Sequence, residues 1–299
     1  MEKIEMEPMN SQEKLSSRRS AIILGGTALA GMLLARHAQA QSTTVTDPDI
    51  LNFALNLEYL EAQFYALATT GTPLSASMTA SGDGTTAGGT VTVKANAMVP
   101  FVTPFLQQFA NEVAMDELNH VTFLRGALGT AAVAQPNIDL MNSFNALAMA
   151  AGLGATFDPF ASETNFLLGA FIFEDVGVTA YQGAAPLISS KTYLDKAVGI
   201  HGVEAYHAAS IRTRIYQAGT TAQQASQAIA ATRAKLDGTN DDDIGVSTAS
   251  NGASTIVDAD ANARTFARST TEVLSIVYGG GAAGTGGAFF PNAMNGTIK

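Results

Sequence analysis

Two Glu-x-x-His sequences constrain the fold of this chain more than any other feature. Glu117 and His120 form the first, and Glu204 and His207 form the second. A spacing of three residues places both side chains on the same face of a helix. One helix can therefore offer a carboxylate and an imidazole to the same metal ion, and the chain contains two such segments.

A second pattern precedes each Glu-x-x-His sequence. Glu58 is followed seven residues later by Tyr65, and Glu174 is followed seven residues later by Tyr181. Both glutamates lie among apolar residues, where a lone carboxylate is costly unless it has a charged partner or a metal ion. The order of the four patterns predicts a duplicated helix pair with approximate two-fold symmetry.

Helical periodicity predicts an all-α four-helix bundle over residues 48–219. Recurring apolar residues, with Pro or Gly near the ends, place the four helices at about 50–70, 104–126, 163–188 and 191–218. A Gly-, Thr- and Ser-rich insertion between the first two helices, residues 71–97, is expected to form a loop or hairpin with a short strand at 91–93. A long crossover, residues 131–162, joins the second helix to the third and includes a helical piece at 140–151.

Residues 220–299 are expected to form a C-terminal helical and Gly-rich extension. Its predicted helices span 222–236 and 261–278, and its Gly-rich tail starts at Gly279. Asp237 and the acidic residues 241–243 predict a solvated turn, because they lack the spacing of a calcium-binding loop.

The motifs and the stretches 51–61 and 173–181 resemble the ferritin-like di-metal-carboxylate superfamily. The resemblance is to its exported branch, which includes desiccation-related proteins, and it covers residues 48–218. It implies two bridging carboxylates (Glu117 and Glu204), two terminal carboxylates (Glu58 and Glu174) and one imidazole for each metal (His120 and His207). Carboxylate oxygens with one imidazole each suit two iron or two manganese ions, spaced roughly 3.5–4 Å apart.

Further residues near the motifs have less defined roles. The resemblance implies that Tyr65 and Tyr181 donate hydrogen bonds that orient the ligating carboxylates. Glu61, one turn after Glu58, is an alternative that replaces or assists it, although the repeated Glu–Tyr spacing favours Glu58. His201 is expected to be an ordinary hydrogen-bonded or exposed histidine. Glu112 and Asp116 are expected to be solvated, or to line a path for ions.

The resemblance implies redox chemistry on oxygen, peroxide or ferrous iron in stress protection. The sequence favours neither ferroxidase-like oxidation nor catalase-like dismutation. The alternative is a non-enzymatic desiccation- or stress-protective structural bundle. The insertion and the extension distinguish the chain from iron-storage ferritins, and the oligomeric state stays open, with a homo-oligomer compatible with the sequence.

Residues 1–40 follow the order of a secretory signal. Arg18 and Arg19 precede a run of small and apolar residues, 21–35, and the cleavage sequence Ala-Gln-Ala follows at 38–40. The paired arginines and the mildly apolar core indicate twin-arginine export and predict a periplasmic or secreted protein. An uncleaved anchor is the alternative. No later stretch is long and apolar enough to span a bilayer, so no membrane contact is expected after cleavage.

The composition excludes several other classes of function. The chain contains no Cys, which excludes disulfide frameworks, thiolate zinc sites and iron–sulfur clusters. It carries 16 basic and 26 acidic residues, a net charge of −10 at pH 7. Such an acidic chain is a poor candidate for binding nucleic acid or anionic membranes.

Overall fold

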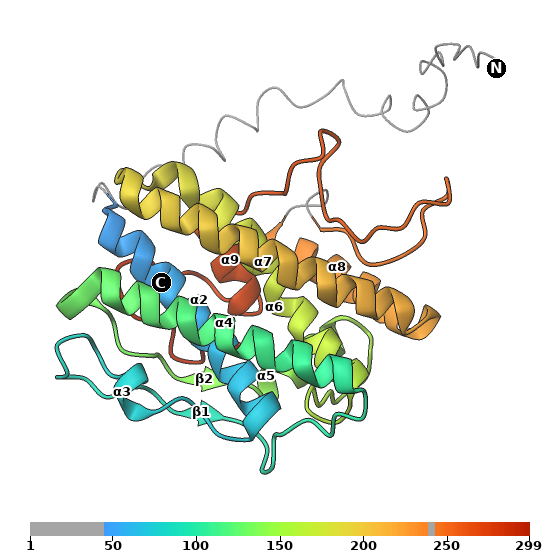
Figure 1. The fold of residues 1–299 in the computed structure, drawn as a ribbon, viewed down its shortest axis with the longest axis horizontal. Helices are drawn as coiled ribbons and strands as arrows, with labels where there is room; N and C mark the ends of the chain where they lie inside the picture. Colours follow the sequence, from blue (N-terminus) through green and yellow to red (C-terminus); the bar gives the residue numbers. More distant parts are fainter. Residues whose placement is uncertain (1–44, 239–242) are drawn as a thin grey trace, which may run out of the picture. The chain divides into compact units, whose positions relative to one another are not determined.

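The computed structural model describes residues 45–238 and 243–299. The predicted export signal, residues 1–40, lies outside the described residues. Four long helices dominate the described part: α2 (Asp47–Thr70), α4 (Pro104–Leu128), α6 (Glu163–Ala184) and α7 (Lys191–Gln217) (Figure 1). The most extensive helix contacts join α2 to α4 and α6 to α7. The predicted all-α bundle is confirmed.

Local sequence signals set the ends of α2. Pro48 lies in its first turn, where proline costs no hydrogen bond. The Asp49 carboxylate accepts a hydrogen bond from the backbone amide of Thr46 at 2.9 Å, which satisfies one of the free donors at the helix start. The helix ends at Gly71, whose φ of 70° is the left-handed conformation that glycine adopts readily.

Equivalent contacts join the two helix pairs at their ends. Asp47, the first residue of α2, accepts hydrogen bonds of 2.8 Å from the backbone amides of residues 189 and 190, just before α7. Glu163, the first residue of α6, accepts bonds of 2.7 and 2.6 Å from the amides of residues 102 and 103, just before α4. Therefore α2 starts beside α7 and α6 starts beside α4, as a two-fold relation between the pairs requires.

The insertion and the crossover meet through a short strand pair. The insertion contains α3 (Ala76–Thr79) and β1 (Val91–Thr92), and the crossover contains η1 (Gly129–Ala131), β2 (Ile138–Asp139) and α5 (Asn142–Ala150). The strands β1 and β2 pair in parallel, with residue 91 opposite residue 138. Of the two predicted forms the insertion is thus a loop and not a hairpin, because its strand pairs outside the insertion.

The C-terminal extension packs over α2 and α6. It contains α8 (Thr220–Asp237) and α9 (Thr270–Val277). The short η2 (Ala185–Leu187) is not part of it and lies between α6 and α7. The backbone amide of Arg268 donates to the Thr179 carbonyl at 3.0 Å. A Cβ at Gly183 would lie 1.9 Å from the Arg268 carbonyl oxygen, so only glycine allows this approach. Near the end of the chain, the Phe289 ring packs 4.9 Å from that of Phe173.

The predicted helix at 261–278 is wrong over residues 261–269. Asp260 accepts hydrogen bonds from the backbone amides of residues 262 and 264, at 2.8 and 3.0 Å, and so holds a turn there. Helix α9 begins only after Ser269, whose side chain accepts a bond from the Glu272 amide. A capping side chain sets this start, and apolar periodicity alone does not reveal it.

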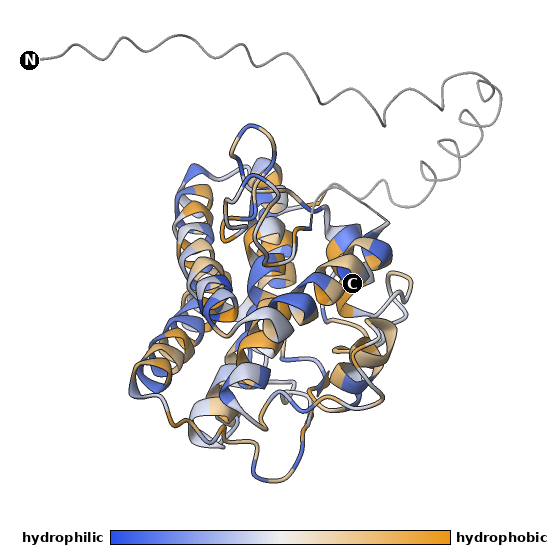
Figure 2. Cartoon of the chain, turned by 90° about the vertical axis from the view of Figure 1, so that its right-hand side faces the viewer, coloured by the Kyte–Doolittle hydropathy of each residue, from blue (hydrophilic) through white to orange (hydrophobic). Residues whose placement is uncertain are grey.

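Hydrophobic and hydrophilic residues alternate along the helices (Figure 2). Helix α6 differs from the other three, because every residue from Phe166 to Tyr181 is buried. It lies between its partner α7 and the C-terminal extension. Within residues 45–238 and 243–299, no helix has both the length and the apolar character needed to cross a bilayer.

Candidate metal centre

Six side chains from the four long helices meet inside the bundle. α2 supplies Glu58 and α6 supplies Glu174, while α4 and α7 each supply one Glu-x-x-His pair. All six are buried, with exposed fractions from 0 to 7%. The six predicted ligand residues therefore lie together, because the motif spacing and the helix pairing direct them to one layer of the bundle.

The six side chains form two groups that share two carboxylates. In the first group, His120 Nδ1 lies 3.2 Å from Glu58 Oε2, 3.3 Å from Glu117 Oε2 and 3.4 Å from Glu204 Oε1.

In the second group, His207 Nδ1 lies 3.1 Å from Glu117 Oε1 and 3.3 Å from Glu174 Oε2. The ligand atoms of each group lie within 4.8 Å of one another, and Glu117 and Glu204 belong to both groups. Two oxygens of one carboxylate can therefore face two different ions.

Several buried atoms of this cluster lack hydrogen-bond partners. They are Glu117 Oε1, Glu174 Oε2, both carboxylate oxygens of Glu204, and His207 Nδ1. Buried polar atoms are normally satisfied, so each exception calls for an explanation. All five atoms are of the kinds that iron and manganese accept as ligands. The residues present thus fit a pair of metal ions.

The predicted tyrosines donate hydrogen bonds to the carboxylates of α2 and α6. The Tyr65 hydroxyl donates to Glu174 Oε1, and the Tyr181 hydroxyl donates to Glu58 Oε1. Each tyrosine thus reaches the carboxylate of the other helix pair. In both cases the second carboxylate oxygen remains directed at a histidine.

The profile of the ferritin-like domain family matches residues 46–217, which contain all of these side chains. The chain belongs to the ferritin-like domain family. The desiccation-related protein PCC13-62 of Craterostigma plantagineum is 30% identical over 191 residues, 62% of this chain and 58% of the relative. The ferritin-like catalase Nec2 of Nesocodon mauritianus is 26% identical over 270 residues, 84% of each chain. No solved structure matches the chain significantly.

The match to the first relative covers little more than half of that relative's length, 58%. The predicted ferritin-like, desiccation-related resemblance is confirmed by these matches.

Burial and mutual charge set the electrostatics of this ferritin-like site. Burial alone would raise the pKa of Glu58, but the charge and hydrogen bond of His120 outweigh it and the pKa is lowered. Burial raises the pKa of Glu117 to about 7, and the neighbouring charge of Glu58 adds to the rise. Burial and the charge of Glu117 raise the pKa of Glu204 well above its usual value.

The two histidines shift in the direction that keeps them protonated. Burial would lower the pKa of His207, but the nearby charges of Glu174 and Glu117 raise it to about 12. The pKa of His120 is also raised, since the charge of Glu58 and hydrogen bonds to the surrounding carboxylates outweigh its burial. The protein without metal thus carries imidazolium groups as counter-charges to its carboxylates.

A fifth buried carboxylate, Glu61, lies beside the cluster but belongs to neither ligand group. In the duplicated pattern, Glu61 of α2 corresponds to Gly177 of α6. A Cβ at Gly177 would lie 2.2 Å from Glu204 Oε2 and 3.5 Å from Glu61 Oε1. Glycine therefore makes room for both carboxylates. Burial, followed by the charge of Glu204, raises the pKa of Glu61 well above its usual value.

Asp116 contacts the cluster from the outside. Its Oδ2 lies 3.1 Å from His207 Nε2, and its side chain is 38% exposed. Such a carboxylate fixes the tautomer and orientation of a ligating histidine. The position that corresponds to Asp116 in α7 is Val203, so His120 has no equivalent carboxylate. The sequence predicted that Asp116 is solvated or lines a path for ions, because it directly precedes Glu117 and is not part of a Glu-x-x-His pair.

His201 lies outside both ligand groups, although it is on the same helix as His207. Its Nε2 is 3.5 Å from Thr265 Oγ1, and burial lowers its pKa. It behaves as the ordinary histidine that the sequence predicts.

A third acidic group lies between α6 and the C-terminal extension. It consists of Asp175, Asp243 and Asp258. Asp175 Oδ2 accepts bonds of 2.7 Å from Arg212 and 2.9 Å from Arg233, and Arg233 also donates to Asp243 at 2.7 Å. These guanidinium groups occupy the position that a cation would take, so the group is a buried ion-pair network.

This network corrects the prediction of a solvated acidic turn. The side chains of Asp237 and Asp243 are 0 and 1% exposed in their ion pairs. Residues 241 and 242 of the predicted turn lie outside the described residues. The side chains of Asp237 and Asp243 are buried because arginines from other parts of the chain neutralise them, and no local pattern shows this.

Proposed function

We propose that this chain is an exported di-metal oxidoreductase that disproportionates hydrogen peroxide. The observation that carries the proposal is the pair of buried ligand groups that share Glu117 and Glu204. The name of the ferritin-like catalase, which aligns over 84% of both chains, supports peroxide as the substrate. The paired arginines near the N-terminus support twin-arginine export to the periplasm or beyond.

The residues of the chain would divide the work as follows. Two iron or manganese ions would be held by Glu58, Glu117, His120, Glu174, Glu204 and His207. When bound, they would relay two electrons from one molecule of peroxide to a second, so that two molecules of peroxide give two of water and one of dioxygen. Tyr65 and Tyr181 hold the terminal carboxylates in place through hydrogen bonds.

The surroundings of the cluster protect and orient it. Asp116 accepts a hydrogen bond from Nε2 of His207, which would leave Nδ1 without a proton and directed at the cluster. Burial and the charge of Glu204 raise the pKa of Glu61, which favours the protonated form of its carboxyl group. The apolar residues of the bundle exclude bulk water, which strengthens each electrostatic interaction in the site.

Metal analysis and turnover together test this proposal. The mature chain, prepared with iron and with manganese, is expected to bind about two ions per chain and to evolve dioxygen from peroxide. A Glu117→Ala/His120→Ala double variant is expected to lose the ions and the activity. No binding of either metal by the wild-type chain would refute the proposal. Ferrous oxidation without peroxide turnover would replace catalase-like by ferroxidase-like activity.

A non-enzymatic protective bundle is the second candidate function. The desiccation-related protein that is 30% identical over 191 residues favours it. In that case metal would raise the unfolding temperature of the chain, and neither peroxide nor ferrous iron would turn over. Thermal unfolding with and without metal, measured on the samples used for turnover, separates the two functions.

A further inference from the structure

An apolar cavity, partly open, lies between the four long helices, next to the layer of metal ligands. All four long helices line it. Among the lining residues, Ala54 is four residues before Glu58, and Ile200 is four before Glu204. On α4, Phe123 lies three residues after His120. The cavity is thus about one helical turn from a ligand on each of these three helices.

Tyr181 joins the cavity to the metal centre. The side chain of Tyr181 lines the cavity, and its hydroxyl donates to Glu58 Oε1. The other residues that line the cavity have apolar side chains. A bound water needs two to four polar partners, and Tyr181 is the one polar side chain among the lining residues, so the space favours an apolar molecule over water. The free volume, about 20 Å³, suits one small molecule.

The internal duplication shows why the cavity exists at this end of the bundle. At the other end, Tyr65 takes the place of Tyr181 and packs against aromatic rings. Its ring centroid lies 5.1 Å from that of Phe64 and 5.8 Å from that of Phe166. Phe64 also packs 5.3 Å from Phe173. These stacked and edge-on rings surround Tyr65.

The residues around Tyr181 are smaller at the corresponding positions. Ala180 takes the place of Phe64, Ile50 that of Phe166, Leu57 that of Phe173 and Ile188 that of Phe101. Two positions differ in the opposite direction: Phe53 and Phe123, which line the cavity, are larger than their counterparts Gly169 and Ser210 and so reduce its volume. The exchange of four rings for aliphatic side chains accounts for the space beside Tyr181.

We propose that this cavity binds dioxygen beside the metal centre. Dioxygen is small and apolar, so an apolar space lined by Tyr181 accepts it and favours it over water. The role of the site rests on the proposed function, in which two molecules of peroxide yield two of water and one of dioxygen. The binding itself depends only on the cavity. The site would receive the product about one helical turn from the ligands.

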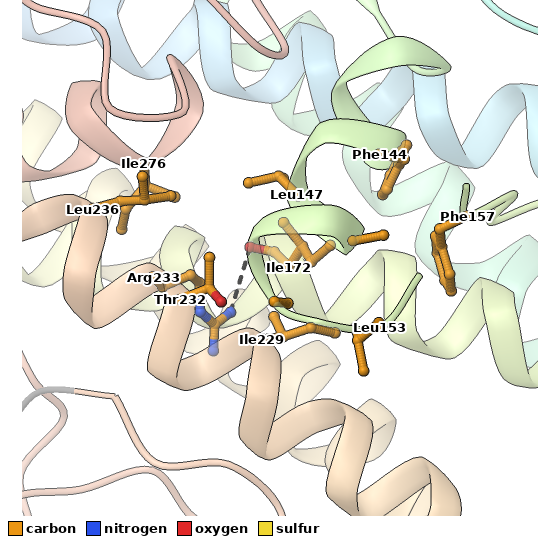
Figure 3. A pocket seen from close by; sticks show the side chains of 12 residues that line it. Phe144, Leu147, Leu153, Phe157, Ile172, Ile229, Thr232, Arg233, Leu236 and Ile276 are labelled. Carbon is orange, nitrogen blue, oxygen red and sulfur yellow. Dashed lines mark hydrogen bonds between the residues drawn. The ribbon is translucent and has the colours of Figure 1, made fainter. Parts of the chain in front are cut away.

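A second apolar pocket provides the contrast. It lies between α5, α6, α8 and α9, and its lining includes Leu147, Ile229 and Arg233 (Figure 3). No metal ligand lines it. Arg233 is at its edge, where Nη1 donates to the Ile172 carbonyl at 3.4 Å. This pocket is therefore a matched control for an apolar space remote from the metal centre.

Methyl NMR under dioxygen pressure tests the proposal directly. Dioxygen is paramagnetic and speeds the relaxation of methyl groups that it contacts. The probe is dioxygen itself, on the mature chain loaded with zinc, which has no redox chemistry. The methyl groups of Ile50 and Ile200 are expected to relax several-fold faster with dioxygen than those of Ile211 and Ile215, which are buried outside the cavity. Equal enhancement at all four residues would overturn the proposal.

Filling variants identify the space. Ala180→Leu is expected to remove most of the enhancement at Ile50 and Ile200. Ala148→Leu, which fills the pocket of Figure 3, is expected to leave it unchanged. The opposite pattern would place dioxygen elsewhere and refute the site. The comparison within the wild-type chain stands even if a filled variant does not fold.

A peroxide assay on the manganese-loaded chain separates the two proposals. Relaxation at the cavity without peroxide turnover would support the binding site and refute the proposed catalase-like function. Turnover without selective relaxation at the cavity would support that function and overturn the dioxygen site.

Discussion

Sharing of Glu117 between the two ligand groups predicts that its removal affects both metal ions. Glu117 places one oxygen 3.3 Å from His120 Nδ1 and the other 3.1 Å from His207 Nδ1. Glu58 belongs to only one group. We therefore expect Glu117→Ala to weaken both ions, and Glu58→Ala to weaken only the ion next to His120.

The size of each effect follows from general values for metal sites. Partners outside the ligand shell are already worth 10–100-fold in affinity, so a lost direct ligand should cost about 100-fold, or ~2.8 kcal/mol. At a metal concentration near 100 times the wild-type Kd, each ion stabilises the chain by about 2.7 kcal/mol. Glu58→Ala would lose about 2.3 kcal/mol of that stabilisation, and Glu117→Ala about twice as much.

Calorimetric titration with Mn²⁺ and thermal unfolding at fixed Mn²⁺ measure the two quantities independently. Glu112→Ala is the matched control, because Glu112 is an exposed glutamate on the same helix. Unfolding of each variant without metal separates ligand loss from damage to the fold. Retention of one ion at the wild-type Kd in Glu117→Ala, or loss of both ions in Glu58→Ala, would refute the assignment of shared and unshared ligands.

Three further predictions concern the surroundings of the site. Raised pKa values keep His120 and His207 protonated in the folded protein without metal. The free energy of unfolding without metal should therefore fall as pH rises above about 6.5, by about 1.4 kcal/mol per pH unit for each proton held. Thermal unfolding from pH 6.5 to 9 checks this, and a rise in stability would contradict it. Asp116→Ala should weaken one ion roughly 10–100-fold and spare the other, whereas Glu112→Ala should change neither in the same titration. Asp175→Ala leaves two buried guanidinium groups without their shared partner, so urea unfolding should show a loss of about 3–5 kcal/mol, and a loss below ~1 kcal/mol would show that other acids compensate.

Much of the bundle could be predicted because helix formation is governed by local patterns. Periodicity and terminal residues place α2, α4, α6 and α7 within a few residues of their observed ends. The repeated spacing of Glu58 with Tyr65 and of Glu174 with Tyr181 indicates which helices correspond. The same repeat pairs Glu61 of α2 with Gly177 of α6. The reason for a glycine there appears only in the structure, where the Glu204 carboxylate lies against Gly177.

Predictions failed or left alternatives open where one part of the chain depends on a distant part. The predicted short strand exists at 91–92, but the sequence left loop and hairpin open, and the strand pairs with residues 138–139 outside its own loop. Asp243 is buried because Arg233 and Arg268 neutralise it. In each case the partner is separated by ten or more residues, and spacing along one helix or loop does not identify it.

The sequence by itself determined the helices, their duplication and the faces on which the carboxylates and imidazoles lie. A helix repeats every 3.6 residues, so these properties follow from short spacings. Only the tertiary structure decided which atoms meet. It directed Asp116 to His207, left Gly177 open for Glu204, and made a cavity beside Tyr181 where Tyr65 is surrounded by rings. These features depend on how side chains from separate helices fill a shared volume, and that volume exists only after the helices have packed.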